Sequence, residues 1–205
     1  MAPTPSPSFK RPLVVSGPSG SGKSTLLSRL FEAYPQDYTF SISHTTRAPR
    51  GAEQNGKEYH FVTKQEFEKM IDEGGFIEHA QFGGNRYGTS FMAVREGGKK
   101  EGESEGKGRR VVLDIEMEGV KQVHKTDLNA RFVFLQPPSV EILEQRLRGR
   151  GTDKEEAIVG RLKQAEKEIE YSKTEGAHDR IIVNDDLEKA WEEFREWVRE
   201  DEEVK

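Results

Sequence analysis

Apolar residues along the chain fall either into short continuous runs or into stretches that repeat every three or four residues. The runs predict buried strands, and the periodic stretches predict helices with one apolar face. The predicted strands are 13–16, 38–43, 59–62, 76–82, 85–89, 111–114, 131–135 and 181–183. The predicted helices are 23–34, 63–71, 118–124, 139–147, 153–171 and 187–198. Strands that alternate with helices are typical of a parallel sheet covered on both faces, so we predict an α/β fold.

The stretch between residues 43 and 89 departs from this alternation, because its strands are short and leave little room for crossover helices. We predict a small, mostly antiparallel subdomain inserted into the main sheet. Thr63, followed three residues later by Glu66, predicts a capping box at the start of helix 63–71. The segment Gly97–Gly108 has five glycines and six charged residues among its twelve positions, which predicts a flexible surface loop.

Composition and charge exclude several classes of protein. No apolar run approaches the length of about 20 residues that spans a bilayer, and the N-terminal segment MAPTPSPSFKRP has no apolar part typical of a secretory signal. The absence of cysteine excludes disulfides and thiolate metal sites. The net charge of −5 gives no indication of a nucleic-acid binder. We therefore predict a cytoplasmic monomer with no membrane or nucleic-acid partner.

The most informative motif is GPSGSGKS, which matches G-x-x-x-x-G-K-[ST] and lies between a predicted strand and a predicted helix. Glycines let several backbone N–H groups turn into one concavity, and the helix N-terminus adds partial positive charge. We expect Lys23 to reach the β- and γ-phosphates of ATP and Ser24 to bind Mg²⁺. The residues assigned to ATP here are Gly17, Pro18, Ser19, Gly20, Ser21, Gly22, Lys23, Ser24 and Thr25.

A carboxylate for Mg²⁺ is expected at the end of another core strand. Asp114 closes the apolar run 111–113, and Glu116 follows two residues later. We assign Asp114 to the metal; the alternative is that both acids are simply polar residues at a strand end.

A phosphate-binding loop alone does not separate kinases from GTPases, ATPases and transporters. The segment 41–59 adds Arg47 and Arg50 in a loop rich in Gly and Pro, followed by Tyr59. Two guanidinium groups three residues apart suit a second phosphate, held bidentately. A solvated basic loop is the alternative interpretation.

Together these segments resemble the guanylate kinases. The resemblance is carried in order by SGPSGSGKSTL, SISHTTRAPR with NGKEYHFV, FIEHAQFGGNRYGTS, VVLDIEMEGV, RFVFLQPPSVEILEQRLRGRGT and IVNDDL. It implies a P-loop nucleoside monophosphate kinase that uses Mg²⁺ and transfers the ATP γ-phosphoryl group to GMP. The chain departs from the family in the longer loop Gly97–Gly108 and at Glu116, where the family commonly has Asp.

The resemblance also implies which residues form the site. It places the GMP phosphate on Ser43, Arg47, Arg50, Tyr59 and Tyr87. It places guanine on Glu78 and Thr89, with Asp114 and Glu116 also assigned to the GMP site. It assigns Arg146, Arg150 and Arg161 of a mobile lid to the transferring phosphoryl group, so that the catalytic set is Lys23, Arg47, Arg146, Arg150 and Arg161. Asn184 is assigned to ATP, with a plain turn asparagine as the alternative.

The chemistry of guanine agrees with this assignment. A carboxylate at Glu78 accepts from guanine N1–H and N2–H₂, and a hydroxyl at Thr89 donates to O6. Adenine presents a lone pair at N1 and lacks the 2-amino group, so AMP leaves these groups unpaired. The rival hypotheses are a kinase for AMP or dTMP, a related module that binds a protein partner without catalysis, and a GTPase switch.

The resemblance divides the chain into predicted parts. A disordered tail at 1–10 precedes one kinase domain at 11–202. The core of this domain comprises about 11–42, 90–145 and 176–202, the GMP-binding subdomain about 43–89, and the lid about 146–172.

Overall fold

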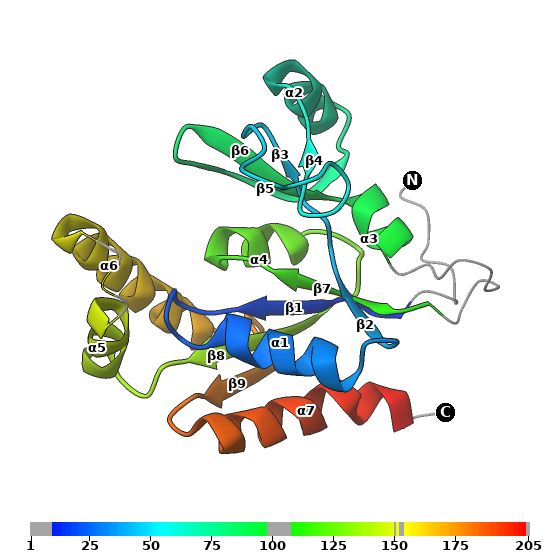
Figure 1. Cartoon of the computed structure of the whole chain (residues 1–205). Helices are drawn as coiled ribbons and strands as arrows, with labels where there is room; N and C mark the ends of the chain where they lie inside the picture. The colour runs from blue at the N-terminus through cyan, green and yellow to red at the C-terminus, as the bar shows by residue number, and fades with distance from the viewer. Residues whose placement is uncertain (1–9, 98–107, 150, 152–153, 204–205) are drawn as a thin grey trace. The chain divides into compact units, whose positions relative to one another are not determined.

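The computed structural model describes residues 10–97, 108–149, 151 and 154–203 (Figure 1). Within these ranges the chain forms two compact units, which we describe separately. The first unit contains residues 10–12, 36–113 and 118–130, and the second unit contains 13–35, 114–117 and 131–203. The fold is α/β, with parallel strands flanked by helices, as predicted.

The second unit is built on three parallel strands, β1 (Leu13–Ser16), β8 (Arg131–Gln136) and β9 (Arg180–Val183). The strand β8 lies in the middle, with Val15 opposite Val133 and Leu135 opposite Ile182. These four side chains have no exposed surface. The continuous apolar run LVVS of β1 is buried at every position, as expected for a strand inside a parallel sheet, whereas β9 keeps Arg180, Ile181 and Val183 exposed.

Two pairs of helices accompany these strands. Helices α1 (Lys23–Ala33) and α7 (Leu187–Glu203) lie side by side, and α7 also contacts β9 (Figure 1). Helices α5 (Val140–Gly149) and α6 (Glu155–Ser172) pack through an apolar cluster. Its buried members are Leu143, Leu147, Ile158 and Ala165. The three- and four-residue spacing in the sequence reflects this one-sided packing.

The first unit contains a parallel strand pair and a separate four-stranded sheet. Strands β2 (Tyr38–Phe40) and β7 (Arg110–Asp114) pair in parallel. The four-stranded sheet has the order β4-β3-β6-β5. Its strands are β3 (His44–Thr45), β4 (His60–Phe61), β5 (Phe76–Phe82) and β6 (Asn85–Ser90). Only β3 and β4 run parallel, and the other pairs are antiparallel, so the mostly antiparallel prediction is confirmed.

Three helices belong to this part of the chain: α2 (Lys64–Asp72), α3 (Phe91–Gly97) and α4 (Met117–Val123). The predicted capping box of α2 is present, because Thr63 Oγ1 accepts from Glu66 N at 3.2 Å and Thr63 N donates to Glu66 Oε2 at 2.7 Å. Phe67, one turn into this helix, is fully buried and stacks on Phe76 at 4.4 Å between ring centroids. The cap thus fixes where the helix begins, and the aromatic pair fixes it to β5.

The structure differs from the sequence-based prediction at two places in the first unit. The predicted strand 38–43 ends at Phe40 as β2, and a separate strand, β3, begins at His44 just beyond it. Ser41 N still bonds to Val112 O, whereas His44 already pairs with β6. The helix α3 was not predicted. Its seven residues are too few to show a helical period, although Ser90 Oγ accepts from Ala93 N at 3.0 Å and so caps its first turn.

The predicted tail 1–10 and the predicted loop Gly97–Gly108 lie outside the described residues, apart from Lys10, Gly97 and Gly108. Gly97 is the last residue of α3. The division into core, GMP-binding subdomain and lid stays a prediction. None of the helices in the described ranges combines the length and the apolar character needed to cross a bilayer.

We predict that Thr63→Ala lowers the free energy of unfolding by about 1 kcal/mol, because Glu66 N loses its cap acceptor. Thr63→Ser keeps the hydroxyl and should stay close to the wild type. Urea unfolding followed by circular dichroism measures both. An alanine variant as stable as the serine variant would show that the capping box contributes nothing.

Candidate active site

The loop between β1 and α1 follows a path that requires glycine. Gly17, Gly20 and Gly22 have φ angles of 141°, 96° and 102°, which L residues rarely adopt. A Cβ at Gly17 would lie 2.3 Å from Leu135 O of β8, and a Cβ at Gly22 would lie 2.1 Å from Asn184 Nδ2. The loop therefore packs directly against β8 and against the residue that follows β9.

The predicted phosphate site lies where this loop enters α1. Gly22 is the N-cap residue, and no side chain caps the helix or adds a negative charge in its first turn. Lys23 Nζ donates to the carbonyl oxygens of Gly17 and Pro18, so its ammonium lies along the loop. Ser24 and Thr25 are exposed on the first turn. Uncapped N–H groups, a helix dipole and an ammonium group together suit phosphate.

Asn184 and Arg161 contact this loop, and Arg146 contacts Asn184. Asn184 is 5% exposed, and its side-chain amide donates to Ser21 O at 2.7 Å. Arg146 of α5 donates to Asn184 O at 2.9 Å, and Arg161 of α6 donates to Ser19 Oγ at 2.8 Å. Contacts from α5, α6 and the end of β9 thus converge on one loop. The predicted site residue Arg150 lies outside the described residues.

Three carboxyl groups act electrostatically near Lys23. Asp114 keeps some solvent access, yet desolvation by the surrounding protein raises its pKa, opposed by Lys23 and reinforced by Glu116. Glu168 of α6 is 4% exposed, and burial raises its pKa as well, although Gln164 Nε2 donates to it at 3.0 Å. Within the described ranges, no group of three or more His, Asp or Glu side chains is arranged to hold a metal ion.

In the first unit, Glu78, Thr89 and Ser43 come together. Glu78 of β5 lies directly opposite Thr89 of β6, and its Oε1 accepts from Thr89 N at 2.9 Å. The hydroxyl groups of Thr89 and Ser43 lie 3.2 Å apart. Glu78 is 8% exposed, and this burial raises its pKa, opposed by the hydrogen bonds from Thr89. The result is a buried carboxyl beside two hydroxyls, an array that can pair with both donors and acceptors of a base.

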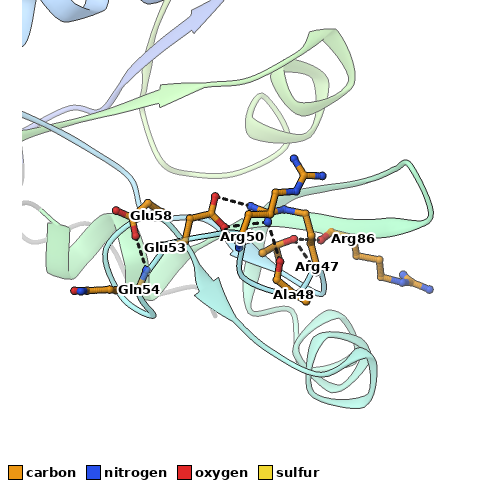
Figure 2. Close-up of polar contacts among 8 residues, drawn as sticks. Arg47, Ala48, Arg50, Glu53, Gln54, Glu58 and Arg86 are labelled. Atoms are coloured by element: carbon orange, nitrogen blue, oxygen red, sulfur yellow. Dashed lines mark hydrogen bonds and ion pairs between the residues drawn. The ribbon is translucent and has the colours of Figure 1, made fainter.

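A second cluster in this unit surrounds Arg47. The guanidinium carbon of Arg47 lies 5.3 Å from the centre of the Tyr59 ring, and the Tyr59 and Tyr87 rings are 6.0 Å apart. Arg47 Nη1 and Nη2 each donate to Glu53 at 3.0 Å, and Arg50 N donates to the same carboxylate at 2.7 Å (Figure 2). The hydrogen bonds that Arg47 donates to Glu53 are the main cause that raises the pKa of Arg47. Arg50 is exposed in the same loop.

Two residues in these clusters were not found by the sequence analysis, Glu53 and Glu168. Glu168 continues the buried stripe of α6, three residues after Ala165, and an acid in an apolar stripe was a signal that could have been noticed. Glu53 carried a weaker signal, as an acid three residues after Arg50 in a loop already assigned to phosphate.

Comparison with known proteins shows the family to which the chain is similar. The family model described as Guanylate kinase matches residues 9–201. A guanylate kinase of Schizosaccharomyces pombe is 52% identical over 184 residues, covering 90% of this chain and 88% of that protein. A guanylate kinase of Sus scrofa is 48% identical over 191 residues, covering 93% of each chain. The crystal structure of guanylate kinase from Anaplasma phagocytophilum is similar with a TM-score of 0.64 at 31% identity, covering 97% of this chain and 88% of that one.

We predict that Gly22→Ala reduces ATP-dependent kcat/KM on the order of 100-fold, because relieving the contact displaces either the loop or the Asn184 amide that bonds to Ser21 O of the loop. Gly176→Ala is the matched control, since Gly176 also has a positive φ, 76°, but an added Cβ there meets nothing within 4 Å. Steady-state kinetics on both variants measure this difference. Equal losses of kcat/KM in the two variants would contradict a specific role for the path of the loop.

We also predict that Glu78→Gln stabilises the free protein relative to wild type at pH 7 more than at pH 4. The folded-state pKa of Glu78 is raised above the unfolded value of about 4.3, so the folded chain holds this proton to higher pH. The contribution of Glu78 to stability is therefore lost as pH rises from the unfolded-state pKa through the raised folded-state pKa. Glutamine has no charge to bury, so the variant does not lose stability in this way. Urea titrations at several pH values measure the difference, and a difference that does not change with pH would refute it.

Proposed function

The chain belongs to the guanylate kinase family, and we propose that the residues described above carry out the reaction of that family. The protein is a nucleoside monophosphate kinase that transfers the γ-phosphoryl group of ATP to GMP and forms ADP and GDP. The observation that carries our assignment of residues is the buried pair of Glu78 and Thr89, directly opposite each other beside Ser43. Such an array matches guanine and leaves groups unpaired against adenine.

On the ATP side, the loop 17–22 and the start of α1 bind the phosphates through backbone N–H groups. Lys23 adds a charge that reaches the β- and γ-phosphates. Asn184 supports this loop through Ser21 O, so its contribution to ATP binding includes holding the loop in shape. Arg146 bonds to Asn184 O and Arg161 bonds to Ser19 Oγ of the loop. In the proposed reaction these two arginines, together with Arg150, neutralise charge on the transferring phosphoryl group.

On the GMP side, Glu78 accepts from guanine N1–H and N2–H₂, and Thr89 and Ser43 offer hydroxyl groups to the base and the phosphate. Burying the Glu78 carboxylate with donors from Thr89 alone among the described residues costs free energy, and its raised pKa reflects this burial. Guanine supplies the missing donors, so recognition removes part of that cost. Asp114 and Glu116 complete the assigned set.

The phosphate of GMP is held by Arg47, Arg50, Tyr59 and Tyr87. Its second pKa is about 6, so at neutral pH it is already largely a dianion and can attack without a strong general base. Rate acceleration then comes from positioning the attacking oxygen and neutralising charge on the transferring group. Closure of the predicted lid excludes water, which limits hydrolysis of ATP.

The residues present fit the Mg²⁺ that this reaction uses. Ser24 presents an exposed hydroxyl on the first turn of α1, and Asp114 supplies a carboxylate at the end of β7. Mg²⁺ in kinases is typically held by one or two protein oxygens, substrate phosphates and waters, so a cage of three protein ligands is not expected. When bound, the ion neutralises charge on the β- and γ-phosphates.

We retain three further predictions with this function. The protein acts as a monomer, it has no nucleic-acid or membrane partner, and it works in the cytoplasm.

The assignment of the acceptor is tested with a coupled assay of ADP release, run with GMP, dGMP, AMP and dTMP in the presence and absence of Mg²⁺. We expect turnover with GMP to exceed turnover with AMP by about 10⁴-fold, since AMP leaves the buried groups unpaired. Equal rates with AMP and GMP would contradict the assignment of Glu78 and Thr89 to guanine.

The Lys23→Ala variant separates an enzyme from a module that only binds a partner. We expect turnover to be lost while the thermal unfolding temperature changes little, because Lys23 is only half-buried and bonds to loop carbonyls. Full activity in this folded variant would contradict the proposed mechanism.

A further inference from the structure

The carboxylate of Glu53 joins two parts of the loop that carries Arg47 and Arg50 (Figure 2). Its Oε1 accepts from Arg47 Nη2, and its Oε2 accepts from both Arg47 Nη1 and Arg50 N. Glu53 N in turn donates to Arg50 O at 3.0 Å, which closes a tight turn at Gly51, where φ is 54°. A rigid turn therefore holds the carboxylate, and the carboxylate holds the guanidinium of Arg47.

The hydrogen-bond donors of Arg47 can be accounted for one by one. A guanidinium has five N–H groups in fixed fork geometry. Glu53 takes one from each Nη, and Ala48 O accepts the second from Nη1 at 2.8 Å. Glu53 and Ala48 do not take the Nε donor or the second Nη2 donor, which lie side by side on the neighbouring edge of the plane, and the Tyr87 side chain also hydrogen-bonds with the guanidinium. This edge has the spacing that suits two oxygens of one phosphate.

We propose that Glu53 is a positioning residue for the acceptor phosphate, which fixes Arg47 so that its Nε and Nη2 edge is presented to a phosphate monoester. This inference rests on the proposed function, in which Arg47 binds the phosphate of GMP. Glu53 itself touches neither the phosphate nor the base.

The surroundings of Arg47 support this role. The guanidinium carbon lies 5.3 Å from the Tyr59 ring centre and 5.8 Å from the Phe61 ring centre, so aromatic side chains limit its movement further. Tyr87, a predicted phosphate ligand, also contacts the guanidinium. Hydrogen bonds from Arg47 and Arg50 lower the pKa of Glu53, so the carboxylate stays ionised throughout the neutral range. A side chain already held in one conformation loses less entropy when the ligand binds.

A carboxylate near a phosphate also repels it, and this effect has the opposite sign. Replacing Glu53 by glutamine would change the charge and the geometry together, so the two effects would mix. Glu53→Asp keeps the charge and shortens the side chain by one methylene, so one carboxylate can no longer reach Arg50 N and both Nη atoms of Arg47. The aspartate variant thus tests positioning alone.

Glu58→Asp is the matched control. Glu58 is a carboxylate of the same loop that accepts from Gln54 N at 2.6 Å, and no arginine contact to it is present in the described part of the chain (Figure 2).

The experiment measures KM for GMP, KM for ATP, kcat, and the inhibition constant of guanosine, which has the base and sugar but no phosphate. Wild-type turnover with GMP is established first, because its absence would refute the proposed function whatever the variants do. For Glu53→Asp we expect KM for GMP to rise by about three- to ten-fold, from the entropy of one side chain that is no longer held. KM for ATP and the guanosine inhibition constant should stay within about two-fold, and Glu58→Asp should match the wild type in all four.

A double-mutant cycle with Arg47→Ala shows whether Glu53 acts through Arg47. In that background, Glu53→Asp should cause no further change in KM for GMP. The inference is overturned if Glu53→Asp leaves KM for GMP unchanged, or if guanosine inhibition weakens as much as GMP binding, which indicates a general structural role. It is also overturned if Glu53→Asp weakens GMP binding equally with and without Arg47.

Discussion

The path of the loop between β1 and α1 is the constraint on which the ATP side of this protein depends. Gly17 and Gly22 adopt conformations that L residues rarely take, and the space for a Cβ is occupied by Leu135 O and by the amide of Asn184. The same loop ends at Gly22, the N-cap of α1, which makes no side-chain cap, and Lys23 donates to the loop carbonyls. In the proposed function, this backbone geometry forms the phosphate site, and the neighbouring strands hold it in place.

The GMP side uses carboxylates in two opposite ways. Glu78 is buried with hydrogen bonds from Thr89 alone among the described residues, and burial raises its pKa. In the proposed assignment, guanine supplies further donors to Glu78, and this gives selectivity for the base. Glu53 is paired with Arg47, and its pKa is lowered. Its charge is already compensated, so it serves to orient a guanidinium. Burial of Glu78 lowers the stability of the free protein in favour of base recognition. The hydrogen bonds of Glu53 add stability and hold Arg47 in one conformation before the ligand binds.

Much of the fold could be predicted from the sequence, because local signals and tertiary packing agree in most elements. The strand 76–82, the start of α1 at Lys23 and the capping box at Thr63 are found where they were predicted. The early end of the predicted strand 38–43 at Phe40 and the new strand β3 could not be predicted, because they depend on a change of partner from β7 to β6. Among the site residues, the roles taken from family resemblance stay predictions, while the structure places Glu78, Thr89 and Ser43 within one cluster.

The sequence by itself determined the phosphate-binding loop, since glycine positions and Lys23 at fixed spacing carry that information locally, and it identified the family. Only the tertiary structure decided which polar groups face each other. Asn184 lies 163 positions from Ser21, yet its amide bonds to that loop. Glu53 hydrogen-bonds Arg47 from a tight turn, and the geometry of that turn could not be read from the amino-acid sequence. Hydrogen bonds depend on distance and direction, and these are set by folding rather than by residue type.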